Sequence, residues 1–332
     1  AGIFSYNGLE WTNHGQKKPD RLSVSSNFYK YAKIYEDKSG TIWFSDDSGL
    51  LSYKENTLKF YSLDSFTWDF VEPEHGDIWA LGEVGPHIYD GQDWAFLPGF
   101  SRSDSDTRNY AAYQDADGSI WVIGDMQSGV WLYDNGKWTE VLDSESNEMK
   151  DGDSFVRDAN DILWAGISNG IYYLNAEGTW EESSDIRGAW TDNGGGYSPQ
   201  LHLTIDGTLI AIARQGLMIY DGKQWSKHLS YGPGRQYNDH FGHGFVEHPP
   251  GVFWLATDKG VRRIQGDFWY DLTVADGLPS NDVYTIELDN SDNLWVGTTE
   301  GLARFIPPSN PNPPAVQLTR IDGGDIPEER TY

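Results

Sequence analysis

The feature that most constrains this 332-residue chain is a short phrase that recurs seven times. Each copy is a turn followed by an apolar residue and, in six copies, a tryptophan. From one copy to the next the distances are 36, 42, 43, 46, 44 and 41 residues. This spacing is typical of propeller blades, which repeat every ~40–50 residues. The copies reach their aromatic position at Trp43, Trp79, Trp121, Trp164, Ile210, Trp254 and Trp295.

Within a repeat the pattern predicts four antiparallel strands, which we label a to d in chain order. The third repeat shows it most fully, with hairpin signals at Asp117-Gly118 and Asn135-Gly136 between alternating runs. Five of the predicted d strands carry a second tryptophan: Trp94, Trp138, Trp180, Trp225 and Trp269. A four-stranded sheet buries both faces only when neighbours stack on it. We therefore predict an all-β fold, a seven-bladed β-propeller of four-stranded antiparallel blades, over residues 1–306.

The two ends of the chain bear on how the last blade is completed. The final repeat ends without a d strand, and residues 9–12 around Trp11 look like a d strand without a blade. We expect this N-terminal strand to pair with the last blade and close the propeller. Residues 2–6 also resemble a c strand, so which terminal strand closes the blade stays open. Residues 307–332 are predicted to be a Pro-rich linker and the start of a further β module or an extended tail.

Charge and composition exclude several classes of function. Lys and Arg number 24 against 51 Asp and Glu, a formal charge of −27 that repels nucleic acid and anionic membranes over most of the surface. Without cysteine there is no disulfide, Cys-ligated zinc site or thiol nucleophile. No apolar run approaches the ~20 residues of a membrane span, and residues 1–20 contain no signal-peptide core. We expect no nucleic-acid partner and no membrane segment in this chain, while a membrane-anchored full-length protein stays open.

The last repeat carries a family resemblance. Residues 276–283, with the sequence DGLPSNDV, continue through Asn293-Leu294-Trp295-Val296-Gly297 and look like the two-component regulator propeller repeat. Residues 307–323 resemble the entry to the three-Tyr module that follows such propellers. The resemblance implies a periplasmic or extracellular location, a role in signal transduction, an oligosaccharide-like ligand and homodimer formation. Most other repeats lack the GLPSN phrase, which sits in a connection between blades.

Aligning the predicted a strands supplies the first set of site candidates. One column is apolar throughout and is predicted to be core: Ile34, Phe70, Ala112, Phe155, Leu203, Phe245 and Ile286. Two positions earlier the column is mixed, as expected where strands emerge at a channel mouth: Ala32, Trp68, Tyr110, Asp153, Leu201, His243 and Tyr284. From this column we take Trp68, Tyr110, His243 and Tyr284 as candidate ligand contacts.

Long d-to-a connections supply the second set, because function concentrates in long loops on a rigid scaffold. Half of the twelve arginines lie in or beside them: Arg21, Arg102, Arg108, Arg157, Arg187 and Arg235. They predict either a positively charged surface around the channel opening of an otherwise acidic protein, or local ion pairs between each arginine and a nearby Asp or Glu. Trp190 and Tyr197 flank a Gly-rich loop, where an aromatic face beside polar groups can stack a sugar ring. The ligand-binding candidates are Trp68, Arg108, Tyr110, Arg187, Trp190, Tyr197, Arg235, Tyr237, His240, His243 and Tyr284.

Metal and cofactor signals are weak. His240 and His243 with His248 form the densest histidine cluster, but strand geometry sends His243 and His248 to opposite ends of strand a. The acidic phrases Asp115-Ala116-Asp117-Gly118 and Asp289-Asn290-Ser291-Asp292 lack the bidentate Glu of a calcium loop and are interpreted as a-to-b hairpin turns. We expect no metal and no cofactor.

Three functions are compatible with these residues. We favour a non-catalytic sensor propeller that binds an oligosaccharide, acidic if the loop arginines contact it. One alternative is a polysaccharide lyase, in which Arg235 neutralises a uronate carboxylate and His243, His240 or Tyr237 abstracts the proton. A second alternative is a protein-interaction scaffold.

Overall fold

The computed structural model describes residues 4–6, 11–13, 34–46, 49–55, 57–63, 67–73, 77–82, 85–97, 100, 109–124, 129–143, 149, 152–167, 170–183, 199–213, 216–230, 244–266, 268–288, 292–305, 317–321 and 330–331. Among these residues the elements are β-strands and one short 3-10 helix, η3 (Val274–Asp276). The strands form seven antiparallel sheets in chain order, the blades of an all-β propeller, together with a separate hairpin. No helix among the described residues could span a lipid bilayer.

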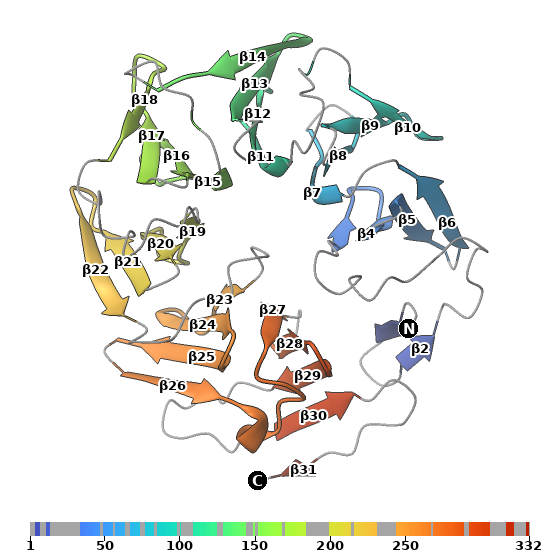
Figure 1. Ribbon diagram of the computed structural model, residues 1–332, viewed down its shortest axis with the longest axis vertical. Helices are drawn as coiled ribbons and strands as arrows, with labels where there is room; N and C mark the ends of the chain where they lie inside the picture. Colours follow the sequence, from blue (N-terminus) through green and yellow to red (C-terminus); the bar gives the residue numbers. More distant parts are fainter. Residues whose placement is uncertain are drawn as a thin grey trace. The chain divides into compact units, whose positions relative to one another are not determined.

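Blades 1 to 3 belong to a compact unit that covers Ala1–Gly152 (Figure 1). Blade 1 contains β3 (Ile34–Glu36), β4 (Ile42–Asp46), β5 (Gly49–Lys54) and β6 (Thr57–Ser62). Blade 2 contains β7 (Thr67–Val71), β8 (Trp79–Gly82), β9 (His87–Tyr89) and β10 (Trp94–Phe96). Blade 3 contains β11 (Asn109–Gln114), β12 (Ile120–Gly124), β13 (Val130–Asp134) and β14 (Lys137–Val141).

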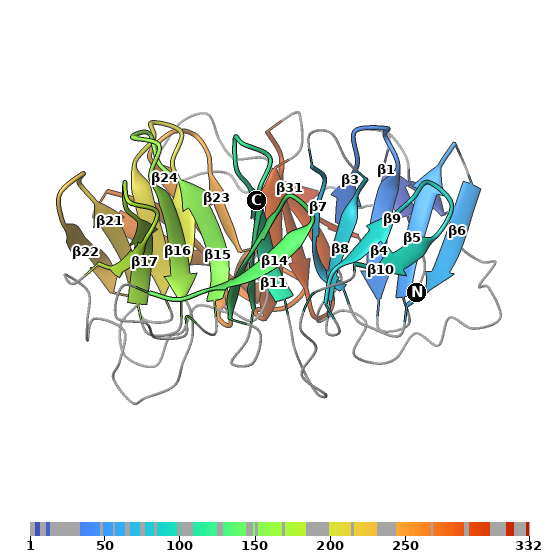
Figure 2. The ribbon, with the colours of Figure 1, turned by 90° about the horizontal axis from the view of Figure 1, so that it is seen from above.

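Blades 4 to 7 belong to a second compact unit, Asp153–Tyr332. Blade 4 contains β15 (Gly152–Arg157), β16 (Leu163–Ile167), β17 (Gly170–Leu174) and β18 (Trp180–Glu182), of which Figure 2 shows the first three side by side. Blade 5 contains β19 (Gln200–Leu203), β20 (Leu209–Ala213), β21 (Gly216–Tyr220) and β22 (Trp225–Ser230). Blade 6 contains β23 (Phe245–Glu247), β24 (Val252–Thr257), β25 (Gly260–Gln265) and β26 (Phe268–Leu272). Blade 7 begins with β27 (Val283–Leu288), β28 (Leu294–Thr298) and β29 (Gly301–Phe305).

The last blade is completed differently from the prediction. The strand next to β29 is β30 (Gln317–Ile321), which pairs Leu318 with Phe305 and is followed by β31 (Arg330–Thr331). The N-terminal strands β1 (Phe4–Tyr6) and β2 (Trp11–Asn13) pair with each other instead. Pairing of the Trp11 strand with the last blade is therefore not found. A hairpin across four residues closes at little entropic cost, and the alternating run at 317–321 satisfies the open edge of β29.

Within each unit, aromatic side chains join one blade to the next by a repeated contact. The b-strand tryptophan packs against the c-strand tyrosine and the d-strand tryptophan of the following blade. Ring centroids are 4.9 Å apart for Trp43–Tyr89, 5.1 Å for Trp43–Trp94, 5.0 Å for Trp79–Tyr133, 6.1 Å for Trp79–Trp138, 4.9 Å for Trp164–Tyr220 and 5.9 Å for Trp164–Trp225. Each such pair adds ~0.5–1.5 kcal/mol to the free energy gained from burial.

Blades 5 and 6 meet through aliphatic residues in the same place. Ile210, which replaces the b-strand tryptophan, and Ile264 of the next blade are fully buried in one cluster. Between blades 6 and 7, Trp254 packs against Phe305 with the ring centroids 5.3 Å apart, so an aromatic contact again joins the two blades. The repeat thus determines the scaffold, and the fifth copy is where it changes.

Two residues of the predicted core column are not core. The first is Leu203, which is 37% exposed. Leu201 is buried instead, and it pairs with Ala211 of the b strand. This is the pairing position that Phe70 and Ala112 have in the a strands of their own blades. The alignment of the fifth a strand was therefore wrong by two residues, because its Leu-His-Leu alternation fits either register.

The second residue is Ile34 of blade 1, which is 63% exposed. Tyr35, on the opposite face of β3, packs in the core instead by stacking on Phe70.

Candidate functional site

The candidate site begins at the first residues of the a strands, where three predicted contacts share an irregular backbone. In β7, Thr67 pairs with Gly82 and Asp69 with Leu81, so that Trp68 is an extra residue. In β11, Tyr110 lies between the paired residues Asn109 and Ala111. Each is the inserted residue of a β-bulge, which bends the strand locally.

Blade 7 repeats this geometry. In β27 the register shifts between Val283 and Thr285, which makes Tyr284 the inserted residue. The neighbouring residue Val283 is fully buried, and so is Thr67 in the corresponding place of β7. A buried residue thus directly precedes the aromatic residue in both strands. Bulges are frequent next to binding sites because they aim one side chain out of the regular alternation.

Blades 2 and 3 bring two of these positions onto neighbouring strands. Strands β7 and β11 pack against each other, and Trp68 and Tyr110 occupy the same place in the two strands. Trp68 is half-buried, and its indole Nε1 atom is buried. A partly exposed aromatic residue on an inner strand is suited to stacking on a flat apolar ligand face.

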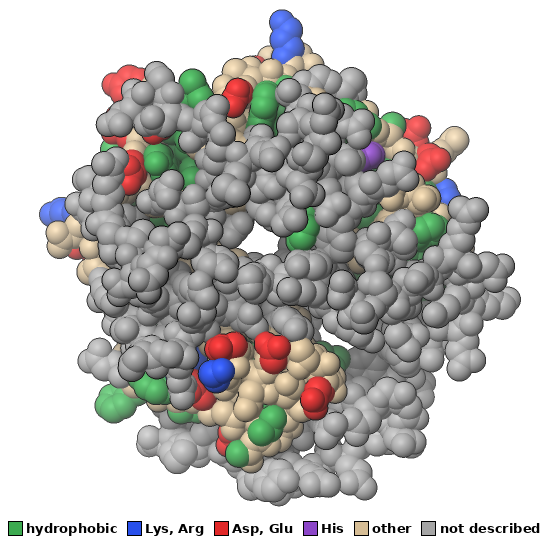
Figure 3. Space-filling view, in the orientation of Figure 1, with side chains coloured by type: hydrophobic (Ala, Val, Ile, Leu, Met, Phe, Trp, Pro, Cys, Tyr) green, Lys and Arg blue, Asp and Glu red, His purple; other side chains and the backbone are tan. Residues whose placement is uncertain are grey.

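The other predicted contacts lie outside the described residues. These are Arg108, Arg187, Trp190, Tyr197, Arg235, Tyr237, His240 and His243, which include all four residues of the lyase hypothesis. They stay predictions. Figure 3 shows that, on the face it draws, acidic side chains of the described residues are interspersed with Lys and Arg.

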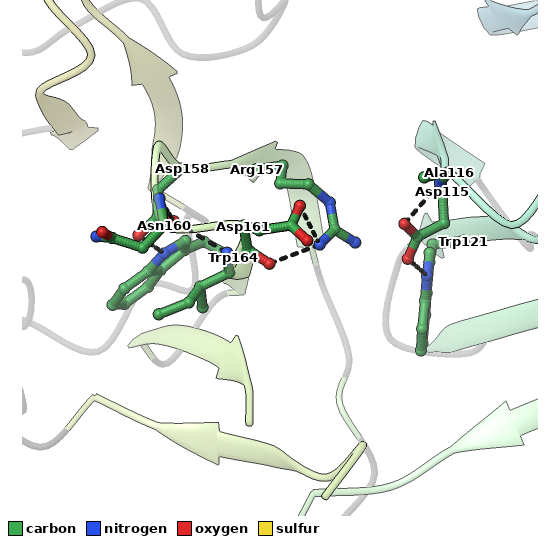
Figure 4. Close-up of polar contacts among 9 residues, drawn as sticks. Asp115, Ala116, Trp121, Arg157, Asp158, Asn160, Asp161 and Trp164 are labelled. Atoms are coloured by element: carbon green, nitrogen blue, oxygen red, sulfur yellow. Dashed lines mark hydrogen bonds and ion pairs between the residues drawn. The ribbon is translucent and has the colours of Figure 1, made fainter. Parts of the chain in front are cut away.

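Among the six loop arginines, Arg157 is the one whose structure is described. Its guanidinium donates to the backbone carbonyl of Asp161 at 2.6 Å and to the carboxylate of the same residue at 3.1 Å (Figure 4). For Arg157 the local ion pair is therefore the arrangement found.

The acidic a-to-b turns have a structural role. The carboxylate of Asp158 accepts backbone N–H groups from Asn160 and Ile162, both at 2.9 Å, and the indole N–H of Trp164 at 3.0 Å (Figure 4). Asp115 accepts from Ala116 and from the indole of Trp121, which confirms that Asp115-Ala116-Asp117-Gly118 is a hairpin turn. Residues 289–291 of the second acidic phrase lie outside the described part.

The same turn in blade 1 shows the electrostatic consequence. Burial opposes ionisation of Asp37, but hydrogen bonds from Trp43, Ser39 and Thr41 outweigh it and hold the pKa of this carboxyl below its usual value. Carboxylates of this kind already serve as acceptors for the turn. No group of three or more His, Asp or Glu residues within the described segments is arranged to hold a metal ion.

The GLPSN phrase is likewise held by internal hydrogen bonds. Asn281 accepts the backbone N–H of Val274 at 2.8 Å, which ties the phrase to the start of η3. Ser280 accepts from the hydroxyl of Thr299 at 2.8 Å, which ties it to the b-to-c turn of the same blade. Gly277 ends η3 with a φ of 104°, a conformation that favours glycine. These contacts give the phrase a scaffolding role.

One titratable residue was not among the candidates. His202 on β19 stacks on Phe245 of the next blade, with ring centroids 4.6 Å apart. Its Nε2 atom is buried and has no hydrogen-bond partner among the described residues. Burial lowers the pKa of His202 from 6.5 to about 4, which keeps the ring neutral near pH 7. A histidine in an apolar-looking strand gave no signal by which the sequence could have revealed this.

Comparison with known proteins agrees with the repeat and the fold. Residues 277–300 match the family described as Two component regulator propeller. No curated protein matches the sequence. The last repeat is thus a two-component regulator propeller repeat, as its phrase predicted.

Solved structures share the propeller fold at low sequence identity. An extracellular domain from B. thetaiotaomicron assigned to a hybrid two component system matches with a TM-score of 0.61 and 14% identity, over 82% of this chain and 39% of that one. Virginiamycin B lyase from Staphylococcus aureus matches with a TM-score of 0.57 and 13% identity, over 83% and 94% of the two chains. PorZ, a surface component of the type-IX secretion system of Porphyromonas gingivalis, matches with a TM-score of 0.56 and 15% identity, over 85% and 44%. This chain therefore spans 39% of the length of that extracellular domain.

Proposed function

We propose that this chain is a non-catalytic sensor module that binds an oligosaccharide at the starts of its innermost strands. The observation that carries the proposal is the pair of bulged aromatic residues, Trp68 and Tyr110, at the same place in two packed a strands. The two-component regulator propeller repeat at 277–300 supports a role in signal transduction. The likeness to an extracellular sensor domain supports a periplasmic or extracellular location.

The ligand chemistry follows from the residue types. An indole and a phenol offer apolar ring faces, which suit a pyranose ring that has an apolar face. Arg108, Arg187 and Arg235 on the predicted loops would favour a ligand that carries carboxylates. An acidic oligosaccharide is therefore the ligand class that we propose for this site.

Calorimetric titration with tetragalacturonate and with cellohexaose tests the proposal. We expect Trp68→Ala and Tyr110→Ala each to weaken tetragalacturonate binding at least about tenfold, the scale of losing an aromatic stacking contact. Phe268→Ala serves as the control, because Phe268 is 83% exposed on an outer strand. Unchanged affinity in the Trp68 and Tyr110 variants would contradict the proposed site.

The other functions that the sequence allows give different results in the same preparation. A lyase would release unsaturated uronate from tetragalacturonate and lose this activity in His243→Ala. A scaffold protein would bind neither sugar and would be revealed by protein partners. Light scattering with and without ligand tests the homodimer that the repeat resemblance implies.

A further inference from the structure

The outer strand of blade 6 departs from the burial found in blades 2, 4 and 5. Trp269 is 46% exposed, whereas Trp94, Trp180 and Trp225 are each at most 8% exposed. The register is the same, since Trp269 pairs with Ile264 as Trp225 pairs with Tyr220. The difference in exposure therefore comes from what surrounds the position.

The preceding blade differs at the matching contact. Where blade 4 places Trp164 against Tyr220 and Trp225, blade 5 places Ile210, which packs with Ile264 in one buried cluster. The contact between blades 5 and 6 is thus made by two isoleucines where the contact between blades 4 and 5 has a tryptophan and a tyrosine. The more exposed Trp269 lies beside this smaller contact, since it pairs with Ile264.

Trp269 is nevertheless held in a fixed orientation. The guanidinium carbon of Arg262 lies 4.0 Å from its ring centroid. Arg262 is itself buried and makes two hydrogen bonds to the Asp271 carboxylate, at 2.7 and 3.0 Å. A planar cation in an ion pair supports an aromatic ring without offering its charge to a ligand.

We propose that Trp269 is a second carbohydrate-binding position, which stacks on one neutral hexose ring at the blade 5–blade 6 seam. A supported, accessible indole provides the flat apolar surface that the C–H face of a hexose can cover. A neutral sugar fits because Arg262 is paired with Asp271 and the chain carries a net charge of −27. This position is independent of the site proposed at Trp68.

The size of the apolar surface favours a sugar over a protein partner. A stable protein interface buries about 800 Å² on each partner. Phe268 and Trp269 are both exposed, but consecutive residues of a strand point to opposite faces. They therefore do not combine into one apolar patch, and a single indole matches a single sugar ring.

Saturation-transfer NMR and calorimetry with cellohexaose test the inference. We expect Trp269→Ala to weaken cellohexaose binding at least about tenfold, while Trp269→Phe keeps most of the affinity because it retains a ring. Phe268→Ala, one residue away on the opposite face, should bind like the wild-type protein. Circular dichroism before titration identifies any variant that has unfolded. In that case Trp269→Leu, which keeps an apolar side chain but no ring, replaces Trp269→Ala and should bind at least about tenfold more weakly than Trp269→Phe.

The outcomes separate the two binding positions. If cellohexaose binds the Trp269→Ala and wild-type proteins equally, or does not bind the wild-type protein, the second position is overturned. Tetragalacturonate binding that depends on Trp68 would then still support the proposed function. Loss of tetragalacturonate binding in Trp68→Ala with cellohexaose binding intact would show that the two positions are separate.

Discussion

The indole nitrogen of Trp164 donates a hydrogen bond to Oδ2 of Asp158 at 3.0 Å. This bond links the a-to-b turn of blade 4 to the tryptophan that packs against blade 5. Equivalent bonds join Asp37 to Trp43 and Asp115 to Trp121. The turn and the seam between blades are therefore stabilised by the same carboxylate.

We expect Asp158→Ala to destabilise the protein by about 2–4 kcal/mol, because it removes the acceptor of two turn amides and of a buried indole N–H. Asp158→Asn should cost less, since its amide oxygen can still accept from the turn. Urea unfolding measures both variants. Glu177→Ala, on an exposed turn of the same blade, is the control, and an equal cost there would contradict the assignment.

The ion pair of Arg262 and Asp271 makes a second prediction. Asp271→Ala should cost roughly 3–5 kcal/mol, because it leaves a buried guanidinium without its carboxylate. The double variant Arg262→Met with Asp271→Leu should recover most of that free energy of unfolding. Lys259→Ala, which breaks an exposed ion pair with Asp258, should change it by about 0–1 kcal/mol. Equal costs for the buried and exposed pairs would refute this account.

Acid sensitivity should depend on His202. Its pKa is about 4 in the folded protein and 6.5 when unfolded, so the unfolded chain takes up the proton first as the pH falls. The wild-type protein should therefore lose stability between pH 6.5 and pH 4, by up to about 3 kcal/mol from this residue. His202→Leu, which cannot be protonated, should remove that part of the pH dependence. Parallel stability curves for the two proteins over this range would rule it out.

Gly260 is a position where a side chain cannot be accommodated. Its φ is 118°, and a Cβ there would overlap the carbonyl oxygen of Leu272 on the adjacent strand. We expect Gly260→Ala to cost roughly 3 kcal/mol or more. Gly251→Ala also has a positive φ, but a Cβ there meets nothing within 4 Å, so its cost should stay near ~1–2 kcal/mol. Thermal unfolding of the pair distinguishes overlap from backbone strain.

Part of the candidate site could be predicted from the residues. The aligned a strands pointed to Trp68, Tyr110 and Tyr284 before their bulges were known. The bulges could not be predicted, because an inserted residue is defined by its partner strand and leaves no mark on the alternation. The exposure of Trp269 could not be predicted either, since its own repeat is regular and exposure depends on side chains from neighbouring strands.

The sequence by itself determined the number of blades, the order of their strands, the acidic turns and the tryptophans that join blade to blade. These features are local, because each depends on residues within one period of about 42 residues. The tertiary structure decided that β30 lies beside β29 while β1 pairs with β2, and that Leu201 rather than Leu203 is core. The first choice depends on which of several similar strands pairs with an open sheet edge. The second depends on how side chains from different repeats pack together between two blades. Both are interactions between residues far apart in the chain, and a pattern within one repeat does not specify them.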